Sequence, residues 1–550
     1  MNGKPALVIT GASGFIGNHL VDYLKEDYTI FAIARRSRKE ANIPYHANLH
    51  WLQCDITNWN TLAGAAEYIR KHGGVDYIIH LAAFYDFTYE YNPAYETINV
   101  NGTRNMLDFS IAVSAKRFLF ASSLAACNFP QGNNVIDEQT PPDADYHYAV
   151  SKKLGENLVR DYSAQIPCSV VRFAAVFSDW CEFAPLYKFL SNWLSNKMDS
   201  RILGGKGESA IPYIHIKDLC RLLKIVCEKS ESLPPFEIYN ASPAGSTSHS
   251  EIFEIATNYY FGRSIKPFHI PKILAYPGLF LRNILTSLHL TGEEPFERYW
   301  MIRYIDQKLN IDSSATQKKL EWLPTPRYHL TRRLLFLLEK LKSHPVEWKV
   351  KNEAALKRVA GRVNLIIYDK MIEQKDVLLA KIKEEILENP RQLFTPFLQL
   401  EEKDLECYIS TVYHLLMAAI RSSDRSLLLK YLDKIAIHKF AEGFEPASLC
   451  GTARIFSDVI INHLICYKEL SKFRQEIYDY VGLSMQIAQD EIEDLYDELA
   501  NESPSELIPK PAFKTSCREL QKMIIQLSAF YQVSPEDFNL SDEYLKNYMQ

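Results

Sequence analysis

Tyr148 and Lys152 are the residues of this chain whose types and spacing best fit acid–base chemistry. They lie four positions apart on a predicted helix, so their side chains share one face of it. A free phenol has a pKa of about 10, too high for easy proton exchange at neutral pH, and a neighbouring ammonium favours the phenolate. The same spacing also occurs by chance on helix surfaces, so the pair needs support from a second feature.

A pair of hydroxyl groups supplies that second feature. The apolar strand predicted over Phe118–Ala121 runs directly into Ser122 and Ser123. Open parallel sheets bind ligands at the carboxyl ends of their strands. The hydroxyl pair is therefore predicted to lie at the ligand-binding edge of a sheet.

Three glycines, at 11, 14 and 17, lie where the first predicted strand, Ala6–Ile9, passes into the helix predicted over Gly14–Lys25. Gly11 permits a tight turn, Gly14 lets the backbone approach a pyrophosphate, and Gly17 allows the helix to pack closely on the strand. The helix N-terminus adds N–H groups that attract phosphate. A packing turn without a ligand is the alternative, but the position between a strand and a helix favours a dinucleotide site.

Two arginines follow the second predicted strand, Thr29–Ala34. Arg35 stands about where NAD-binding proteins place a carboxylate for the ribose 2′-hydroxyl, and Arg36 is next to it. Guanidinium groups suit a 2′-phosphate, so NADP is predicted in preference to NAD. A solvated basic loop is the alternative.

The elements that must position these residues alternate between strand and helix. Further strands are predicted over 75–81, 117–121 and 169–173, and strand signals continue more sparsely through 202–240. Such alternation predicts a parallel sheet covered by helices on both faces. From about Pro345 the strand-like runs disappear, and helices are predicted over 351–387, 402–420, 426–441, 449–481 and 483–499. We therefore expect a first domain over 1–340 and an all-helical domain over 345–550.

Composition excludes several classes of protein. The 550 residues are 47% apolar with a formal net charge of -5, which is typical of a globular protein and gives no basic field for nucleic acid. Ten cysteines show no paired spacing, so neither a metal site nor a disulfide framework is predicted. The start of the chain does not resemble a signal peptide, and no apolar run is long enough to span a bilayer. A cytoplasmic location is expected.

The order of the motifs resembles the extended short-chain dehydrogenase/reductase family, also called NAD-dependent epimerases/dehydratases. The resemblance covers residues 4–335 and is carried by ordered segments: 10–17, 54–56, 80–83, 99–103, Ser122-Ser123, Tyr148-x-x-x-Lys152, 213–218 and 312–324. It implies a Rossmann-type doubly wound parallel sheet, mainly 1–175, with a small substrate-binding portion, mainly 176–335.

The resemblance also implies residue roles. Tyr148 would transfer a proton, Lys152 would hold the nicotinamide ribose, and Ser123 would bind the substrate oxygen, so these three form the catalytic set. Together with the two arginines, the implied cofactor contacts are Thr10, Gly11, Ser13, Gly14, Phe15, Ile16, Gly17, Arg35, Arg36, Asp55, Ile56, Leu81, Ala82, Ala83, Asn99, Tyr148 and Lys152. The implied substrate contacts are Phe84, Tyr85, Ser123 and Ala175. For Asp55 and Asn99, a turn and a helix cap are the structural alternatives.

Departures from the family pattern limit the reactions of the family that fit this sequence. Leu124 and Ala125 stand where sugar dehydratases of the family carry an Asp-Glu couple, and apolar residues cannot move protons. Alanine follows Arg172-Phe173 where epimerases usually carry a diphosphate-binding asparagine, and Ile211-Pro212 replaces a common arginine. Burying a diphosphate without such partners is costly. The resemblance therefore points to the hydroxysteroid dehydrogenase and dihydroflavonol reductase branches.

Apolar and aromatic segments at 84–89, 180–187 and 270–290 agree with a lipophilic substrate and with peripheral membrane contact, although core packing and subunit contact explain them equally well. A sugar epimerase of the same fold and an NADPH-binding redox sensor are the other functions considered. The segment 431–444 resembles helical sensor domains of bacterial stress-signalling regulators. A regulatory or dimerising role is expected for the helical domain, and a homodimer for the protein.

Overall fold

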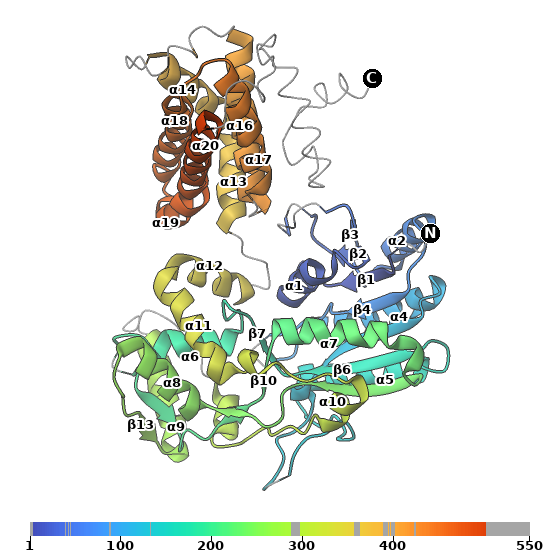
Figure 1. The fold of residues 1–550 in the computed structure, drawn as a ribbon. Helices are drawn as coiled ribbons and strands as arrows, with labels where there is room; N and C mark the ends of the chain where they lie inside the picture. Colours follow the sequence, from blue (N-terminus) through green and yellow to red (C-terminus); the bar gives the residue numbers. More distant parts are fainter. Residues whose placement is uncertain are drawn as a thin grey trace. The chain divides into compact units, whose positions relative to one another are not determined.

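A computed structural model describes residues 4–38, 40–41, 43, 46–86, 90–132, 134–197, 199–287, 298–356, 363–388, 394, 397, 402–422 and 425–501. The chain divides into two compact units (Figure 1). The first contains Met1–Ile43 and Asn48–Gly361, and the second contains Pro44–Ala47 and Arg362–Gln550.

The first unit is built on a seven-stranded sheet in which every neighbouring pair is parallel. Its order is β11-β6-β5-β4-β1-β2-β3, with strands β1 (Ala6–Thr10), β2 (Thr29–Ala34), β3 (Leu49–Gln53), β4 (Tyr77–His80), β5 (Arg117–Ser123), β6 (Cys168–Phe173) and β11 (Phe236–Ala241). The strand order reverses between β1 and β4, and such a switch point forms a ligand crevice at the carboxyl ends of the strands.

Helices cover both faces of this sheet. Leu7 and Ile9 of β1 pack into one core with α1 (Phe15–Leu24) and α7 (Ile216–Glu228), whereas Val8 packs into the other with α2 (Trp59–Lys71), α4 (Gly102–Ala112) and α5 (His147–Tyr162). Side chains of a strand alternate between faces, so a continuous apolar strand serves both cores. The predicted Rossmann-type parallel sheet is confirmed. Strand β3 lies outside the predicted strands, because this edge strand is only half-buried and lacks a continuous apolar run.

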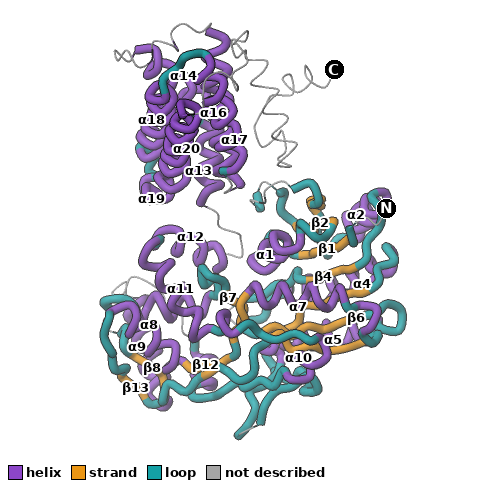
Figure 2. The backbone as a smooth tube through the Cα atoms, in the orientation of Figure 1, coloured by secondary structure: helices purple, strands orange, loops and turns teal. Residues whose placement is uncertain are grey.

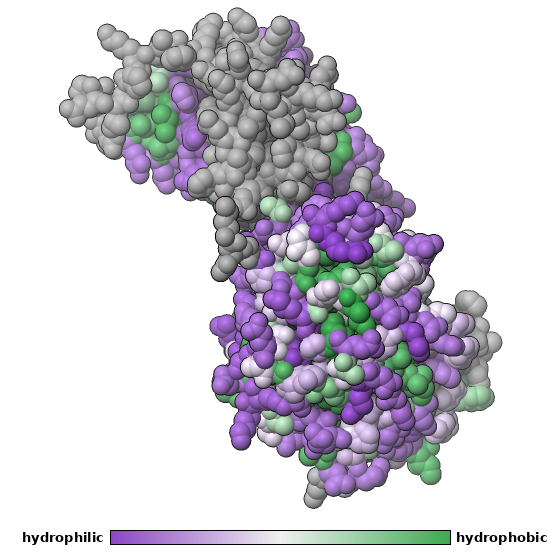
Figure 3. Space-filling view, turned by 90° about the vertical axis from the view of Figure 1, so that its right-hand side faces the viewer, coloured by the Kyte–Doolittle hydropathy of each residue, from purple (hydrophilic) through white to green (hydrophobic). Residues whose placement is uncertain are grey.

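The portion predicted to bind the substrate consists of short strand pairs and helices (Figure 2). The pairs are β7 (Ala175–Phe177) with β10 (Tyr213–His215), β9 (Ala210–Ile211) with β12 (Thr247–Ser248), and β8 (Ile202–Gly204) with β13 (Phe268–Ile270). A third core joins them to helices α6 (Ala184–Trp193), α8 (His249–Phe261), α11 (Leu330–Ser343) and α12 (Pro345–Leu356). Helix α9 (Lys272–Ser287) follows β13. The surface in Figure 3 is mostly hydrophilic, with hydrophobic residues gathered in smaller patches between.

Helix α12 belongs to this first unit, although its sequence lies beyond residue 345. Trp348 is buried in the third core, and Asn352 is almost fully buried beside it. The Asn352 amide donates to the carbonyl of Trp180 (2.8 Å) and accepts from the N–H of Glu182 (2.8 Å). Cys181 and Glu182 both have positive φ, 74° and 53°, which is strained for residues other than glycine. Helix α12 therefore holds a strained loop in place.

The second unit is helical. Its described helices are α13 (Val363–Glu373), α14 (Lys375–Glu388), α16 (Glu402–Ser422), α17 (Ser426–Ala441), α18 (Pro446–Ile465), α19 (Arg474–Ile477) and α20 (Leu483–Asn501). The long predicted helices are shorter here. Gln374 separates α13 from α14, and α18 ends near Cys466 in a turn where Leu470 N–H donates to Tyr467 carbonyl. Among the described helices, none is long and apolar enough to cross a membrane.

We expect Asn352→Ala to lower the free energy of unfolding by about 1–3 kcal/mol, because it leaves buried backbone groups of the strained loop without partners. Urea unfolding of the full chain measures the change. Glu353→Ala, on the same helix with a side chain that is 46% exposed, serves as the control and should shift stability by less than about 0.5 kcal/mol. Equal effects of the two substitutions would contradict this account of the loop.

Candidate active site

The glycine turn brings β1 against the loop that follows β4. Gly11 has a φ of +68°, and a Cβ at this position would lie 2.9 Å from the backbone nitrogen of Ala82. A Cβ on Gly17 would lie 2.3 Å from the Gly11 carbonyl oxygen. Both positions therefore require glycine, the first for its conformation and contact, and the second for the packing of α1 on the turn.

The start of α1 fits a pyrophosphate. Gly14 is the N-cap, makes no side-chain cap hydrogen bond, and is followed by a first turn without an acidic residue. A Cβ on Gly14 would approach only the Gly11 carbonyl oxygen closely, at 3.3 Å. First-turn N–H groups have no partner within a helix, and no side chain of the N-cap occupies them here. Thr10 and Gly17 are buried, whereas Ser13, Phe15 and Ile16 are half-buried around this turn.

A chain of hydrogen bonds through His80 connects β1, β4 and α4. The Ala82 N–H donates to Thr10 Oγ1 (3.1 Å), and Thr10 Oγ1 bonds His80 Nδ1 (2.8 Å). On the other side, His80 Nε2 bonds Thr103 Oγ1 (3.1 Å), which donates its own proton to the Asn99 carbonyl (2.7 Å). Because the Thr103 hydroxyl is used as a donor, we assign the imidazole proton to Nε2. The chain therefore needs a neutral His80.

Asn99 clamps the loop after β4 to helix α5. Its amide exchanges two hydrogen bonds with the backbone of Phe84 (2.6 and 2.8 Å) and donates to Ser151 Oγ (2.9 Å). Ser151 precedes Lys152 and donates in turn to the Tyr148 carbonyl (2.7 Å). Asn99 is 2% exposed, so it acts by positioning the loop and α5. It lies in a π-helical turn, Thr97–Asn101, that a sequence pattern does not reveal.

The residues predicted around the adenosine half lie at two strand ends. Arg35 is exposed and Arg36 half-buried after β2, and their carbonyls are held by the side chains of Gln53 and Trp51 on β3. Asp55 caps a turn by accepting from Thr57 N–H (2.9 Å). Ile56 is buried and packs closely on Gly102. A Cβ on Gly102 would lie 2.8 Å from Ile56 Cδ1. Leu81 and Ala82 are half-buried beside the turn, and Ala83 is exposed.

Lys152 is buried beneath the phenol of Tyr148. Its Nζ donates to the Ala121 carbonyl (2.6 Å) and lies 5.7 Å from the centroid of the Tyr148 ring. Burial lowers the pKa of Lys152 to about 8, and the Glu156 carboxylate opposes this shift. Helix α5 reaches β5 so closely because Gly155 has no side chain: a Cβ there would lie 2.5 Å from Phe120 Cζ.

The two serines at the end of β5 have different environments. Ser122 is buried and donates to Glu156 Oε1 (2.6 Å), which is paired with Arg172 of β6. Ser123 is half-buried, and its Oγ accepts from the Ala125 N–H (3.2 Å). The first hydroxyl therefore braces α5 against the sheet, and the second lies at the site.

A cavity of about 840 Å³ adjoins this edge of the sheet. Six residues predicted as cofactor or substrate contacts line it: Phe15, Ile16, Tyr85, Ser123, Tyr148 and Ala175. The Tyr85 and Tyr148 ring centroids are 4.5 Å apart. Phe84 lies outside the wall, with its ring edge-on to Tyr95 at 5.0 Å. The remaining predicted residues lie outside the cavity wall, around the glycine turn, at the ends of β2 and β3, and near α5.

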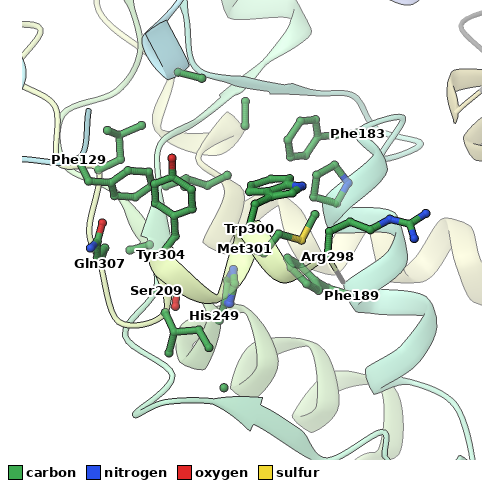
Figure 4. A pocket seen from close by; sticks show the side chains of 18 of the residues that line it. Phe129, Phe183, Phe189, Ser209, His249, Arg298, Trp300, Met301, Tyr304 and Gln307 are labelled. Atoms are coloured by element: carbon green, nitrogen blue, oxygen red, sulfur yellow. The ribbon is translucent and has the colours of Figure 1, made fainter. Parts of the chain in front are cut away.

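The rest of the wall comes from the substrate-binding portion. Of the aromatic residues noted after β6, Phe183 lines the cavity, whereas Trp180 and Tyr187 pack in the third core. Further wall residues were not predicted from the sequence, and many of them are labelled in Figure 4: Phe129, Phe189, Trp193, His249, Arg298, Trp300, Met301 and Tyr304. Only the folded structure identifies them as wall residues, because they come from separate segments without a shared motif. Phe87, Thr88 and Tyr89 lie outside the described residues.

The sheet, the glycine turn and the Tyr148–Lys152 pair define a dinucleotide-dependent enzyme of the short-chain dehydrogenase/reductase type. Residues 7–242 match the NAD dependent epimerase/dehydratase family, and this part of the chain belongs to that family. It is thus an NAD(P)-dependent enzyme unit.

Individual relatives are distant. The chain is 24% identical to uncharacterized protein y4nG of Sinorhizobium fredii over 65% of this chain and 82% of that protein. It is 26% identical to a putative UDP-glucose 4-epimerase of Methanocaldococcus jannaschii over 45% of this chain and 80% of that protein. It is 27% identical to vestitone reductase of Medicago sativa over 44% of this chain and 77% of that protein. The relatives include epimerases and reductases, so they do not choose between these reactions.

We expect His80→Gln to reduce the pH dependence of folding stability. Burial, and secondarily the Lys152 charge, lower the pKa of His80 to about 3 in the folded state, against about 6.5 in an unfolded chain. The unfolded chain therefore binds the proton first, and this group makes the fold less stable as the pH falls below about 6.5. The slope is at most about 1.4 kcal/mol per pH unit.

Urea unfolding at pH 7, 6 and 5 measures this slope in both proteins. His72→Gln, an exposed position at the end of α2, should keep the wild-type slope. Identical slopes for wild type and His80→Gln would show that the imidazole is not held neutral.

Proposed function

We propose that this chain is an NADP-dependent oxidoreductase that transfers a hydride between NADP(H) and a carbonyl or secondary alcohol of a lipophilic small molecule. The observation that carries the proposal is the position of Ser123 and Tyr148 in the wall of a cavity whose other residues are mostly apolar and aromatic. A group held between these two hydroxyls would have its apolar remainder in contact with that wall.

The chain's own residues supply the proton chemistry. NADPH, when bound, supplies a hydride to the carbonyl carbon. Tyr148 gives its phenolic proton to the carbonyl oxygen, and Ser123 donates a hydrogen bond to the same oxygen. The buried Lys152 ammonium stabilises the negative charge left on the phenol. The reverse steps oxidise the alcohol, with Tyr148 accepting the proton.

The charges of the wall disfavour a nucleotide sugar. Ala174, Ala175, Ile211 and Pro212 all line the cavity. They form the two stretches in which the family resemblance leads us to expect a diphosphate-binding asparagine and a diphosphate-binding arginine. Among the described wall residues, only Arg298 carries a positive charge. A desolvated diphosphate needs charged or hydrogen-bonding partners, so an uncharged substrate fits better.

Two neighbouring wall residues disfavour sugar dehydration. Leu124 and Ala125 follow Ser123 in the cavity wall, and neither can donate or accept a proton through its side chain. Elimination of water from a sugar needs a second proton-transfer group beside the tyrosine. Simple hydride and proton transfer needs none.

Access to the cavity also suits a lipophilic compound. Leu274 belongs both to the cavity wall and to the exposed apolar surface of α9, where Ile273 is 81% and Phe280 60% exposed. Exposed apolar side chains of this kind are typical of surfaces that bind membranes or partners. Peripheral membrane contact therefore stays part of the proposal. The proposal also includes a homodimer, a cytoplasmic location and a regulatory role of the helical second unit.

Two other functions make distinguishable predictions. An epimerase of the same fold would purify with tightly held cofactor, turn over a UDP- or GDP-sugar, and consume no net NADPH. A redox sensor would bind NADPH without any turnover that depends on Tyr148. Either outcome would overturn the oxidoreductase proposal.

Replacing Arg35 and Arg36 by alanine should weaken NADPH binding at least tenfold while changing NADH binding little, because guanidinium groups bind the 2′-phosphate that only NADPH carries. Fluorescence titration with both cofactors measures the ratio. The double variant Arg70→Ala/Lys71→Ala, at two exposed positions of α2, is the charge-matched control. An unchanged NADPH to NADH ratio would reassign the two arginines to a solvated loop.

Tyr148→Phe should lower the rate of NADPH-dependent reduction of lipophilic ketones by about 10²–10⁴-fold, and leave the Kd of NADPH within about twofold. Tyr162→Phe removes a phenolic hydroxyl from the same helix, where it bonds Asp108 away from the cavity, and should retain full activity. A Tyr148→Phe variant with undiminished turnover would remove the phenol from the mechanism.

A further inference from the structure

His249 is held rigidly at the start of α8 by contacts that leave its side chain unused. Ser248 and Glu251 cap the helix reciprocally, with Glu251 N–H donating to Ser248 Oγ and Ser248 N–H donating to the Glu251 carboxylate. The His249 N–H donates to the Ser209 carbonyl (3.0 Å). The helix terminus is thus satisfied without the imidazole.

The imidazole lies in the aromatic part of the cavity wall (Figure 4). Its ring centroid is 4.6 Å from that of Phe189 and 6.1 Å from that of Trp193. The residue is half-buried, and neither ring nitrogen has a hydrogen-bond partner among the described residues. Burial lowers the pKa of His249 to about 4, so at neutral pH the ring is uncharged and offers one N–H donor and one acceptor.

Two other polar groups of this wall, Ser209 and Glu182, already have protein partners. Ser209 Oγ accepts from the Asp306 N–H (2.9 Å). The Glu182 carboxylate accepts from Ser178 Oγ (2.5 Å) and lies 3.3 Å from His19 Nε2. An imidazole that is placed between aromatic rings without such a partner loses free energy relative to water, and a ligand group that pairs with it recovers that loss.

The charge of the partner follows from the same surroundings. Two of the wall residues are carboxylates, Glu182 and Asp199, and aromatic rings surround His249. An anionic group there would be repelled by the carboxylates and poorly solvated by the rings. An uncharged hydroxyl or carbonyl group pairs with a neutral imidazole without that cost.

We propose that His249 forms a second polar subsite of the cavity, and that the substrate is an elongated lipophilic carbonyl compound or alcohol with an uncharged hydroxyl or carbonyl group at the end remote from the reacting carbon. This inference rests on the proposed function. Ser123 and Tyr148 bind the reacting oxygen, the apolar wall covers the body of the molecule, and His249 binds the remote oxygen.

A matched pair of ketones tests the subsite. The two compounds are 4-(4-hydroxyphenyl)cyclohexanone and 4-phenylcyclohexanone, which differ only in a hydroxyl remote from the ketone. With NADPH, we expect the wild-type full chain to show about a tenfold higher kcat/KM for the hydroxylated ketone, mainly through KM. His249→Phe should bring the ratio within about twofold, and His249→Gln should retain part of it because an amide also donates and accepts.

Gln307→Leu is the matched control, since it removes another polar side chain of the same wall and should keep the wild-type ratio. Calorimetric titration of both ketones into the protein with NADP⁺ measures binding without turnover. If the wild type reduces neither ketone but binds the hydroxylated one more tightly through His249, the oxidoreductase proposal fails and the subsite stands. The subsite inference is overturned if the wild type binds the two ketones equally or binds neither. It is also overturned if the preference for the hydroxylated ketone survives in His249→Phe, or if it disappears in Gln307→Leu.

Discussion

The close approach of β1 to the loop after β4 is the constraint on which the site depends. No Cβ fits between Gly11 and Ala82, so the two backbones touch where the strand order reverses. The Thr10 and His80 side chains then fasten the contact, and Thr103 extends it to α4. A charged His80 could not keep its place in this chain of donors and acceptors, and its burial is what keeps it neutral. Packing and protonation therefore stabilise the same geometry.

Helix α5, which carries the predicted acid–base pair, is positioned by a second buried network. Ser122, Glu156 and Arg172 connect β5, α5 and β6, and all three are almost fully buried. A buried ion pair contributes little net stability when it is compared with apolar packing, but breaking one partner leaves an uncompensated charge. The network therefore fixes the register of α5 on the sheet more than it adds stability. Lys152 lies one turn before Glu156 on that helix, so its place follows from this register.

The sequence predicted those parts of the fold and site that depend on local pattern. Continuous apolar strands predicted the parallel sheet, which is confirmed. The glycine spacing at 11, 14 and 17 and the Tyr148–Lys152 spacing predicted a dinucleotide site and an acid–base pair, each with a structural alternative. The edge strand β3 was missed because half-buried strands lack that pattern. Helix α12 carries an ordinary helical pattern, and nothing local shows that Asn352 closes the loop at Cys181. The residue roles at the site remain predictions, because they concern ligands rather than the fold.

His249 and the aromatic wall could not be found in the sequence for a different reason. Their segments lie far apart along the chain and meet only through tertiary packing, so no spacing rule connects Phe189, His249 and Trp300. The groups that would carry the reaction come from the sheet and α5, whereas those that would contact the substrate body come from separate short elements packed beside it. Changes in the second set leave the first intact. This division lets relatives of 24–27% identity include both epimerases and reductases on one scaffold. The specificity of this chain therefore has to be argued from its cavity wall.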